Sequence, residues 1–289
     1  MNKKFSVLIS LYITNDPEYF KQAMISIFDQ TYQPTEVILV IDGEKTKEQQ
    51  NIIDYFQCKY INILKIIQLD KNIGQGAALN EGLKYCSYEL VARMDTDDIS
   101  KETRFEKQIS IFERNPEIDI VSSWVDEFFE LPNDKISIRK IPEKHFEIEK
   151  YAKYRCPLNH PAVMYKKSKV IMCGGYEQMG LLDDYILWVK MLKMGAVFYN
   201  IQESLLYYRL GKDMYKRRGG VKYAIDECKS QWFFFQNGII SLQVALGNIF
   251  VRCFVRIMPE KVRMFLYKNI LRKQDLKNII KNLLIKVDV

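Results

Sequence analysis

The chain has 289 residues, of which 48% are hydrophobic and 27% charged, a balance that excludes a disordered chain. Two histidines and six scattered cysteines without a Cys-x-x-Cys pair argue against a zinc site and favour free thiols in a reducing cytosol. The segment from Arg252 to Val289 holds ten of the 43 basic residues and three of the 36 acidic ones, so the net charge of +7 lies in this tail. Such a tail suits either nucleic acid or an anionic membrane.

Strand and helix patterns alternate over the first 125 residues. Phe5 to Leu11 is a nearly continuous apolar run, typical of a strand buried on both faces. The residues before it lack the pattern of a secretory signal, so none is expected. Pro17 to Gln30 has apolar residues at helical spacing behind the N-cap residue Asp16. Further strands are expected over 36–41, 61–69 and 88–94, with helices over 47–55 and 76–86. This alternation predicts an α/β fold with a mostly parallel sheet flanked by helices.

Polar residues follow each of the four expected strands. In an open parallel sheet the ligand lies beyond the carboxyl ends of the strands. The positions there are Ser10 to Tyr12, Asp42 with Gly43, Asp70 to Gly74, and Asp95 to Asp98. We therefore expect these residues to converge on one cleft.

The remainder of the chain divides at about residue 220. Residues 127–156 are polar and irregular and are expected to cover one side of this cleft, and a second apolar block follows from Asn159. Residues 221–289 are expected to be helical throughout. The apolar run from Gly238 to Val251 is shorter than the roughly 20 residues that span a bilayer, so no transmembrane helix is expected. The prediction is a catalytic domain over 1–220 and a helical, basic extension over 221–289.

Three carboxylates lie close together at Asp95, Asp97 and Asp98, directly after an expected strand. Such a cluster is electrostatically unfavourable unless a cation or hydrogen-bond donors compensate for it. Oxygen ligands without a nearby histidine or cysteine favour Mg²⁺ or Mn²⁺ and suit a metal-bound diphosphate. The alternative is a solvated acidic turn that caps the following helix.

Six segments in order resemble the family 2 inverting glycosyltransferases, which have the GT-A fold. They are SVLISLY from Ser6, SIFDQTYQPTEVILVIDG from Ser26, NIGQGAALNEGL from Asn72, VARMDTDDIS from Val91, and the pair NHPAVMYKKSKVIMCGGY from Asn159 with LLDDYILW from Leu181. The resemblance extends roughly from Phe5 to Gly220. It implies an enzyme that transfers a sugar from a nucleotide-sugar donor in the synthesis of O-antigen, capsule or exopolysaccharide.

The resemblance assigns donor-side roles by position. Ser10, Tyr12 and Asp42 are expected to hold the uracil and ribose of a UDP-sugar, with a simple turn at Asp42-Gly43 as the alternative. Asn72 and Gly74 would form the loop that approaches the donor, and Arg93 would meet the diphosphate or pair with an aspartate. Within the cluster, Asp97 is expected to be the main metal ligand, with Asp98 second and Asp95 shared between ribose and metal; the cofactor is Mn²⁺ or Mg²⁺.

A second acidic pair, Asp183 and Asp184, stands where the family usually has Glu-Asp. By resemblance Asp184 is the general base that removes the proton of the acceptor hydroxyl, which inverting transfer requires. The pair also fits the start of a helix, where negative charge is stabilised. Both interpretations can hold together.

Cationic and imidazole side chains are candidates for the acceptor side. His160 is expected to contact the acceptor or the donor phosphate, although a lone histidine often has a structural role. Arg209, Arg217 and Arg218 are expected to bind the diphosphate of UDP or of a lipid-diphosphate acceptor, because the guanidinium group matches phosphate oxygens. A solvated basic linker is the alternative.

The tail from Met258 to Leu284 has apolar residues at helical spacing between Lys and Arg, a pattern of helices at membrane interfaces. The expected location is therefore the cytoplasmic face of the membrane, with peripheral attachment to anionic lipid. A helix packed on the catalytic domain is the alternative. By resemblance, the acceptor is a saccharide linked to undecaprenyl diphosphate.

The predicted activity is metal-dependent inverting transfer of a hexose or N-acetylhexosamine from a UDP-sugar to this acceptor. A sugar nucleotidyltransferase would be expected to have a Gly-rich loop with a basic residue near the N-terminus, where this chain has SLYITNDPEYF. A nucleic-acid-binding protein would leave both acidic centres unexplained, so no nucleic-acid partner is expected.

Overall fold

The computed structural model describes residues 3–177, 182–211 and 219–258. One half of its sheet is parallel, in the order β3-β2-β1-β4, and consists of β1 (Phe5–Leu11), β2 (Glu36–Ile41), β3 (Leu64–Gln68) and β4 (Leu90–Met94). The crossovers contain α1 (Pro17–Phe28), α2 (Lys47–Lys59) and α3 (Gln75–Tyr85). The alternating pattern of the sequence therefore predicted this half correctly. Helix α2 runs past its predicted end at Tyr55 because Phe56 continues its buried face.

The other half of the sheet is mixed. Beyond β4 lie β8 (Met164–Lys166), β6 (Ile120–Phe128), β9 (Phe198–Arg209) and β5 (Ile99–Ser100), and β7 (Lys135–Arg139) pairs with β6. Strand β8 is antiparallel to both neighbours, whereas β6 and β9 are parallel. Residues 127–156, expected to be irregular, instead hold β7 and α5 (His145–Ala152). Both are short and polar, so their hydrophobic periodicity is weak.

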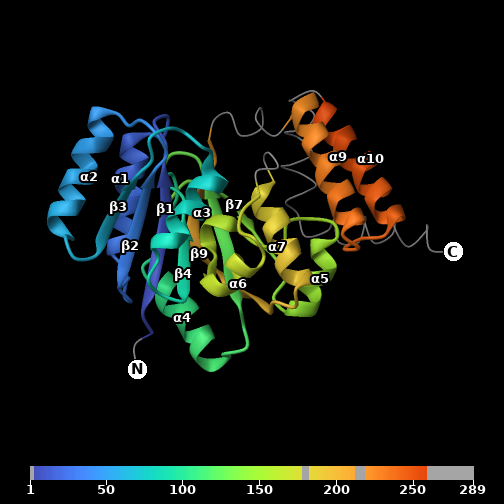
Figure 1. The fold of residues 1–289 in the computed structure, drawn as a ribbon, viewed down its shortest axis with the longest axis horizontal. Coiled ribbons are helices and arrows are strands. Elements are labelled where there is room, and N and C mark those ends of the chain that lie inside the picture. The colour runs from blue at the N-terminus through green and yellow to red at the C-terminus, as the bar shows by residue number, and fades with distance from the viewer. Residues whose placement is uncertain (1–2, 178–181, 212–218, 259–289) are drawn as a thin grey trace.

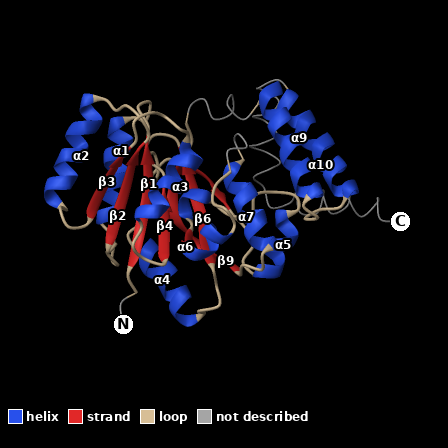
Figure 2. Cartoon of the chain, in the orientation of Figure 1, coloured by secondary structure: helices blue, strands red, loops and turns tan. Residues whose placement is uncertain are grey.

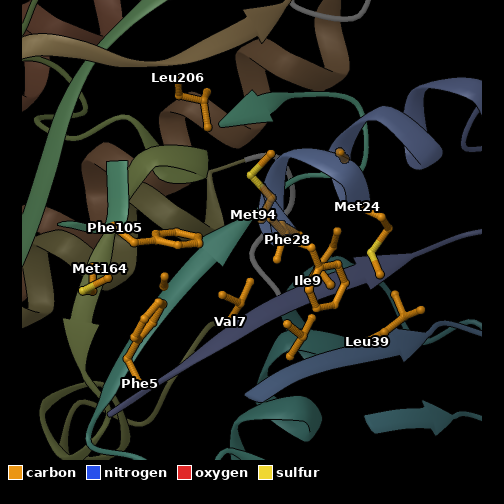
Figure 3. Packing of buried hydrophobic residues seen from close by; sticks show 14 of the residues in the cluster. Phe5, Val7, Ile9, Met24, Phe28, Leu39, Met94, Phe105, Met164 and Leu206 are labelled. Carbon is orange, nitrogen blue, oxygen red and sulfur yellow. The ribbon is translucent and has the colours of Figure 1, made fainter. Parts of the chain in front are cut away.

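Helices cover both faces of the sheet (Figures 1 and 2). Alternate residues of a strand point to opposite faces. Phe5, Val7 and Ile9 of β1 therefore enter one core, with α1, α2 and α4 (Arg104–Arg114), as Figure 3 shows. Leu8 enters a second core with α3, α5, α6 (Lys167–Met172) and α7 (Asp183–Lys193). Each fully buried side chain of this size contributes about 1.5–3 kcal/mol.

Two further helices, α9 (Val221–Gln236) and α10 (Leu242–Ile257), form an antiparallel pair that packs on α7 (Figure 1). The break at 237–241 corrects the expectation of continuous helix. The predicted amphipathic helix from Met258 to Leu284 lies outside the described residues, apart from its first residue. Among the described helices, none combines the length and hydrophobicity that crossing a bilayer needs.

Candidate active site

The carboxyl ends of β1 to β4 meet at one edge of the sheet. In the register of the parallel strands, Leu11 lies opposite Ile41, Ile41 opposite Gln68, and Ile9 opposite Met94. Ser10 is the next-to-last residue of β1, and Tyr12 directly follows the strand with 39% of its surface exposed. The edge is therefore where the residues predicted to bind the donor must gather.

Asp42 fixes the loop that follows β3. Its carboxylate accepts hydrogen bonds from Ile73 N at 2.7 Å, from Gly74 N at 3.1 Å and from Asn72 Nδ2 at 3.0 Å. The following residue must be glycine, because Gly43 has φ +89° and a Cβ there would lie 2.7 Å from Asn72 N. The predicted residues Asp42, Asn72 and Gly74 are thus in contact, and the aspartate shapes the loop.

The same loop reaches the carboxylate cluster. Gln75, the first residue of α3, donates from Nε2 to Asp95 Oδ1 at 3.0 Å. No role was predicted for Gln75 from the sequence, although it lies inside the segment that resembles the family. The ends of β2, β3 and β4 are therefore joined through side chains as well as through the sheet.

Asp95, Asp97 and Asp98 can each place a carboxylate oxygen within 4.8 Å of the others. Asp98 is fully buried; one of its oxygens accepts from Arg209 N at 2.8 Å, and the other has no hydrogen-bond partner among the described residues. Burial, and after it the charges of Asp97 and Asp95, raise the pKa of the Asp98 carboxyl well above its ordinary value. An all-oxygen cluster with a buried, incompletely bonded oxygen fits a hard divalent cation.

Two buried arginines support this cluster. Arg93, at 1% exposure, forms an ion pair with Asp95. Burial alone would lower the pKa of the Arg93 guanidinium, but the Asp95 carboxylate outweighs it and raises that pKa. Of the two roles predicted for Arg93, the structure therefore shows the pairing with an aspartate. Arg104, for which the sequence indicated no role, donates from Nη2 to the carbonyl of Arg93 at 2.7 Å.

Arg209, at the end of β9, contacts the loop that holds Asp95, Asp97 and Asp98. Its guanidinium donates to Asp97 O at 2.9 Å, to Glu130 O at 2.7 Å and to Gln22 Oε1 at 2.7 Å, and it lies 3.8 Å from the ring centroid of Tyr19. The side chain is thus buried and supports the loop, whereas the sequence led us to expect it to face a diphosphate. That contact stays a prediction, and Arg217 and Arg218 lie outside the described residues.

The second acidic centre lies at the start of α7. Asp183 and Asp184 occupy its first turn, where the partial positive charge of the helix stabilises carboxylates. A Cβ on Gly76 of α3 would lie 3.0 Å from Asp183 Oδ2. Gly76 directly follows Gln75, which contacts Asp95. The two acidic centres, far apart in the sequence, therefore border the same turn of α3.

Tyr176 lies beside the same turn of α3, with its Cβ 3.2 Å from the position that a Cβ on Gly76 would take. Its backbone is held by Asn80 of α3 through hydrogen bonds of 2.8 and 2.7 Å, and its hydroxyl is 3.0 Å from His160 Nε2. Burial raises the pKa of the Tyr176 hydroxyl and outweighs the opposing charge of Arg93; smaller contributions from the charges of Asp184 and Asp95 also raise it. This tyrosine was not among the predicted site residues, although it ends one of the segments that resemble the family.

His160 is a neutral side chain in this setting. Burial, and then the charge of Arg93, lower the pKa of its imidazole well below the usual value. The ring also contacts Trp188, at 5.8 Å between centroids, in addition to Tyr176. A neutral imidazole suits a hydrogen bond better than an ionic contact with phosphate, and the predicted ligand contact of His160 stays a prediction.

The profile described as Glycosyl transferase family 2 matches residues 6–172. An Escherichia coli protein described as UDP-Gal:alpha-D-GlcNAc-diphosphoundecaprenol beta-1,3-galactosyltransferase is 44% identical over 93% of this chain and 97% of its own length. AmsE of Erwinia amylovora, an amylovoran biosynthesis glycosyltransferase, is 36% identical over 91% of this chain and 98% of its own.

Solved structures share the fold at low identity. The complex of S. aureus TarS 1–349 with UDP-GlcNAc has a TM-score of 0.64 at 18% identity, covering 94% of this chain and 77% of that one. The mannosyltransferase PcManGT from Pyrobaculum calidifontis, in complex with GDP-Man and Mn²⁺, has a TM-score of 0.63 at 14% identity, covering 98% and 88%. The chain therefore belongs to glycosyl transferase family 2, has the GT-A fold, and is a glycosyltransferase.

Proposed function

We propose that this enzyme transfers a hexose or N-acetylhexosamine from a UDP-sugar, with inversion and with Mn²⁺ or Mg²⁺, to a saccharide on undecaprenyl diphosphate during bacterial surface polysaccharide synthesis. The observation that carries the proposal is that Gln75 contacts Asp95 while the next residue, Gly76, lies against Asp183. The E. coli relative supports the substrates, since its description names UDP-Gal and GlcNAc-diphosphoundecaprenol. Family membership decides against the sugar nucleotidyltransferase alternative.

The donor side would be formed by the sheet edge. Asp97 and Asp98, with Asp95, would hold the cation, which when bound stabilises the negative charge of the departing UDP. Ser10, Tyr12 and the loop fixed by Asp42 would enclose the uracil and ribose. Arg93 and Arg209 keep the aspartates in place before any ligand arrives, so little reorganisation is needed on binding.

The acceptor side would be formed by the start of α7. As the acceptor oxygen forms its bond to the anomeric carbon, the bond from that carbon to the UDP oxygen breaks. Asp184 receives the proton of the acceptor hydroxyl, and attack opposite to the leaving group inverts the anomeric centre. Asp183 lies against α3 beside Tyr176, whereas the Asp184 carboxylate accepts hydrogen bonds from Tyr185 N at 2.8 Å and from Cys156 Sγ at 3.8 Å, which would orient it.

A donor and acceptor screen tests the proposal. The purified enzyme is incubated with UDP-galactose, UDP-glucose, UDP-GlcNAc, UDP-GalNAc or GDP-mannose and a synthetic GlcNAc-diphosphate-lipid, with Mn²⁺, with Mg²⁺ or with a chelator. We expect a β-linked product from one of the UDP-sugars, and none after chelation. Transfer from GDP-mannose alone, an α-linked product, or full activity in chelator would contradict the proposal.

A further inference from the structure

Helix α10 presents an apolar face to solvent. Its exposed large side chains recur every three to four residues, which places them on one side of the helix: Leu242, Leu246, Phe250, Val251, Phe254 and Ile257. Phe250 is 76% exposed. The structure describes this helix throughout, and no charged residue is among its exposed positions. We call this set the α10 outer face.

Three polar side chains of α10, those of Asn248, Arg252 and Arg256, point toward α9 and the body of the molecule, while Gln243 in its first turn is exposed. Asn248 donates to Gln231 at 2.7 Å, and Arg252 and Arg256 pair with the buried Glu227 at 2.5 and 2.8 Å. A surface helix ordinarily buries its apolar side and exposes its polar side. In α10 most of the large apolar side chains are exposed and the arginines face inward. This arrangement indicates that the α10 outer face is covered by an apolar partner.

Helix α9 also exposes apolar side chains, and they are of the kinds found at membrane interfaces. Its exposed positions include Trp232 and Ile225, together with Lys222 and Lys229. Tryptophan and lysine beside aliphatic residues suit the boundary between headgroups and acyl chains. The hairpin thus offers an apolar surface with basic residues in the same element.

The hairpin is fixed to the acceptor side of the enzyme. Tyr185 directly follows Asp184 in α7. Phe234 of α9 packs on this tyrosine, with the two ring centroids 4.9 Å apart. Asn248 and Arg252 of α10 donate to the carbonyls of Lys153 and Tyr154, just beyond α5. A partner that binds the α10 outer face would therefore also fix the position of α7, the helix that carries the proposed base Asp184.

We propose that the α10 outer face, with Trp232 of α9, docks the enzyme on the surface of an anionic lipid bilayer. This inference rests on the proposed function, because an undecaprenyl-linked acceptor is presented at such a surface. The sequence after α10 supports lipid over a second copy of the chain. Residues 259–289 contain eight Lys or Arg against three Asp or Glu. This charge attracts anionic headgroups and repels a second copy.

Vesicle sedimentation of the full-length enzyme tests the docking surface. The probes are phosphatidylcholine vesicles with and without phosphatidylglycerol, each at low and at high salt. Phe250→Asp and Phe254→Asp should each weaken partition into anionic vesicles on the order of tenfold, since each removes a large side chain from the apolar phase. The matched control is Ile61→Asp, which places the same charge at a 73% exposed apolar residue after α2. We expect it to bind vesicles like the wild type.

High salt separates the two contributions, because it screens the basic residues and leaves apolar burial intact. Residual binding at high salt should be lost in Phe250→Asp and kept in Ile61→Asp. Vesicle binding that is unchanged in both phenylalanine variants would overturn the proposal. A concentration-dependent dimer that Phe250→Asp abolishes, without vesicle binding by the wild type, would also overturn it and assign the face to self-association.

Activity distinguishes this failure from failure of the proposed function. Phe250→Asp should retain transfer to a short-chain, water-soluble acceptor and lose about tenfold with the same acceptor embedded in vesicles. Equal loss on both acceptors would contradict a docking role. Absence of transfer by the wild type from any UDP-sugar, with vesicle binding and its dependence on Phe250 intact, would reject the proposed function and leave the docking surface standing.

Discussion

The two acidic centres are built in opposite ways. Asp95, Asp97 and Asp98 follow one strand and are held by Arg93 and Arg209, both buried. Asp183 and Asp184 instead open a helix, and their position depends on the packing of α7 against α3. The first centre is held by buried side chains from two strands, which suits a cation site. The second is placed by long-range packing, which suits a residue that must meet a separate substrate. Changes in the first should therefore abolish donor binding, and changes in the second should affect turnover alone.

Replacing Asp97 by alanine should have the largest effect. Loss of a ligand at the proposed cation site removes several kcal/mol of charge stabilisation on the leaving diphosphate, so turnover should fall at least about a thousandfold. Titration calorimetry should show that metal-dependent UDP binding is lost as well. Thermal unfolding serves as the control for folding. Unchanged UDP affinity in the presence of Mn²⁺ would place the cation elsewhere.

The Asp184→Asn variant should lose turnover while keeping donor binding. A positioned general base contributes about 10²–10⁴-fold, and asparagine of the same shape cannot accept the proton. The value of kcat should fall by this factor, and the affinity for UDP with Mn²⁺ should match the wild type. Retained activity would reassign the base, with Asp183→Asn as the next variant to measure.

Gly76→Ala tests the contact that joins the centres. The added Cβ would lie 3.0 Å from Asp183 Oδ2 and 3.2 Å from Tyr176 Cβ, so α7 or the carboxylate must shift. A displacement of this kind should lower kcat roughly ten- to a hundredfold, with little change in UDP affinity. Gly247→Ala in α10 is the matched control, because apart from the backbone of its own helix nothing lies within 4 Å of its Cβ position. Equal kcat in both variants would show that the contact has no role in turnover.

Tyr176→Phe should have the smallest effect. It removes the hydroxyl that contacts His160 and preserves the ring, so unfolding free energy should fall by about 1 kcal/mol and kcat severalfold. Denaturant unfolding and steady-state kinetics measure the two quantities. Tyr85→Phe, at a 47% exposed tyrosine, is the control. A loss of metal-dependent UDP binding in Tyr176→Phe would instead assign the tyrosine to the donor side.

Local patterns predicted the parallel half of the sheet. The sequence of β1 is a nearly continuous apolar run, and that of α1 has apolar residues at helical spacing behind an N-cap. They also placed Asp42, Asn72, Gly74 and Asp95 at one edge, because strand ends in a parallel sheet must meet. They did not predict the antiparallel β8, whose three residues are too short for periodicity.

No local pattern indicated that Arg209 would be buried, because it lies at the end of β9 and the Asp97 carbonyl that it contacts is more than a hundred residues earlier. The same holds for Tyr176, whose partners His160 and Asn80 come from separate elements. Long-range contacts of this kind depend on how elements pack, which the spacing of residues within one element does not record. The reversed polarity of α10 was hidden for the same reason, since an amphipathic pattern does not state which side faces inward.

Anomalous scattering from Mn²⁺ in crystals of the Asp184→Asn variant with a UDP-sugar tests the central claim most directly. We predict a single strong peak bordered by the carboxylates of Asp95, Asp97 and Asp98, with the sugar lying between this ion and the substituted side chain at the start of α7. An ion bound away from these carboxylates, or a sugar on a face that the start of α7 does not border, would contradict it.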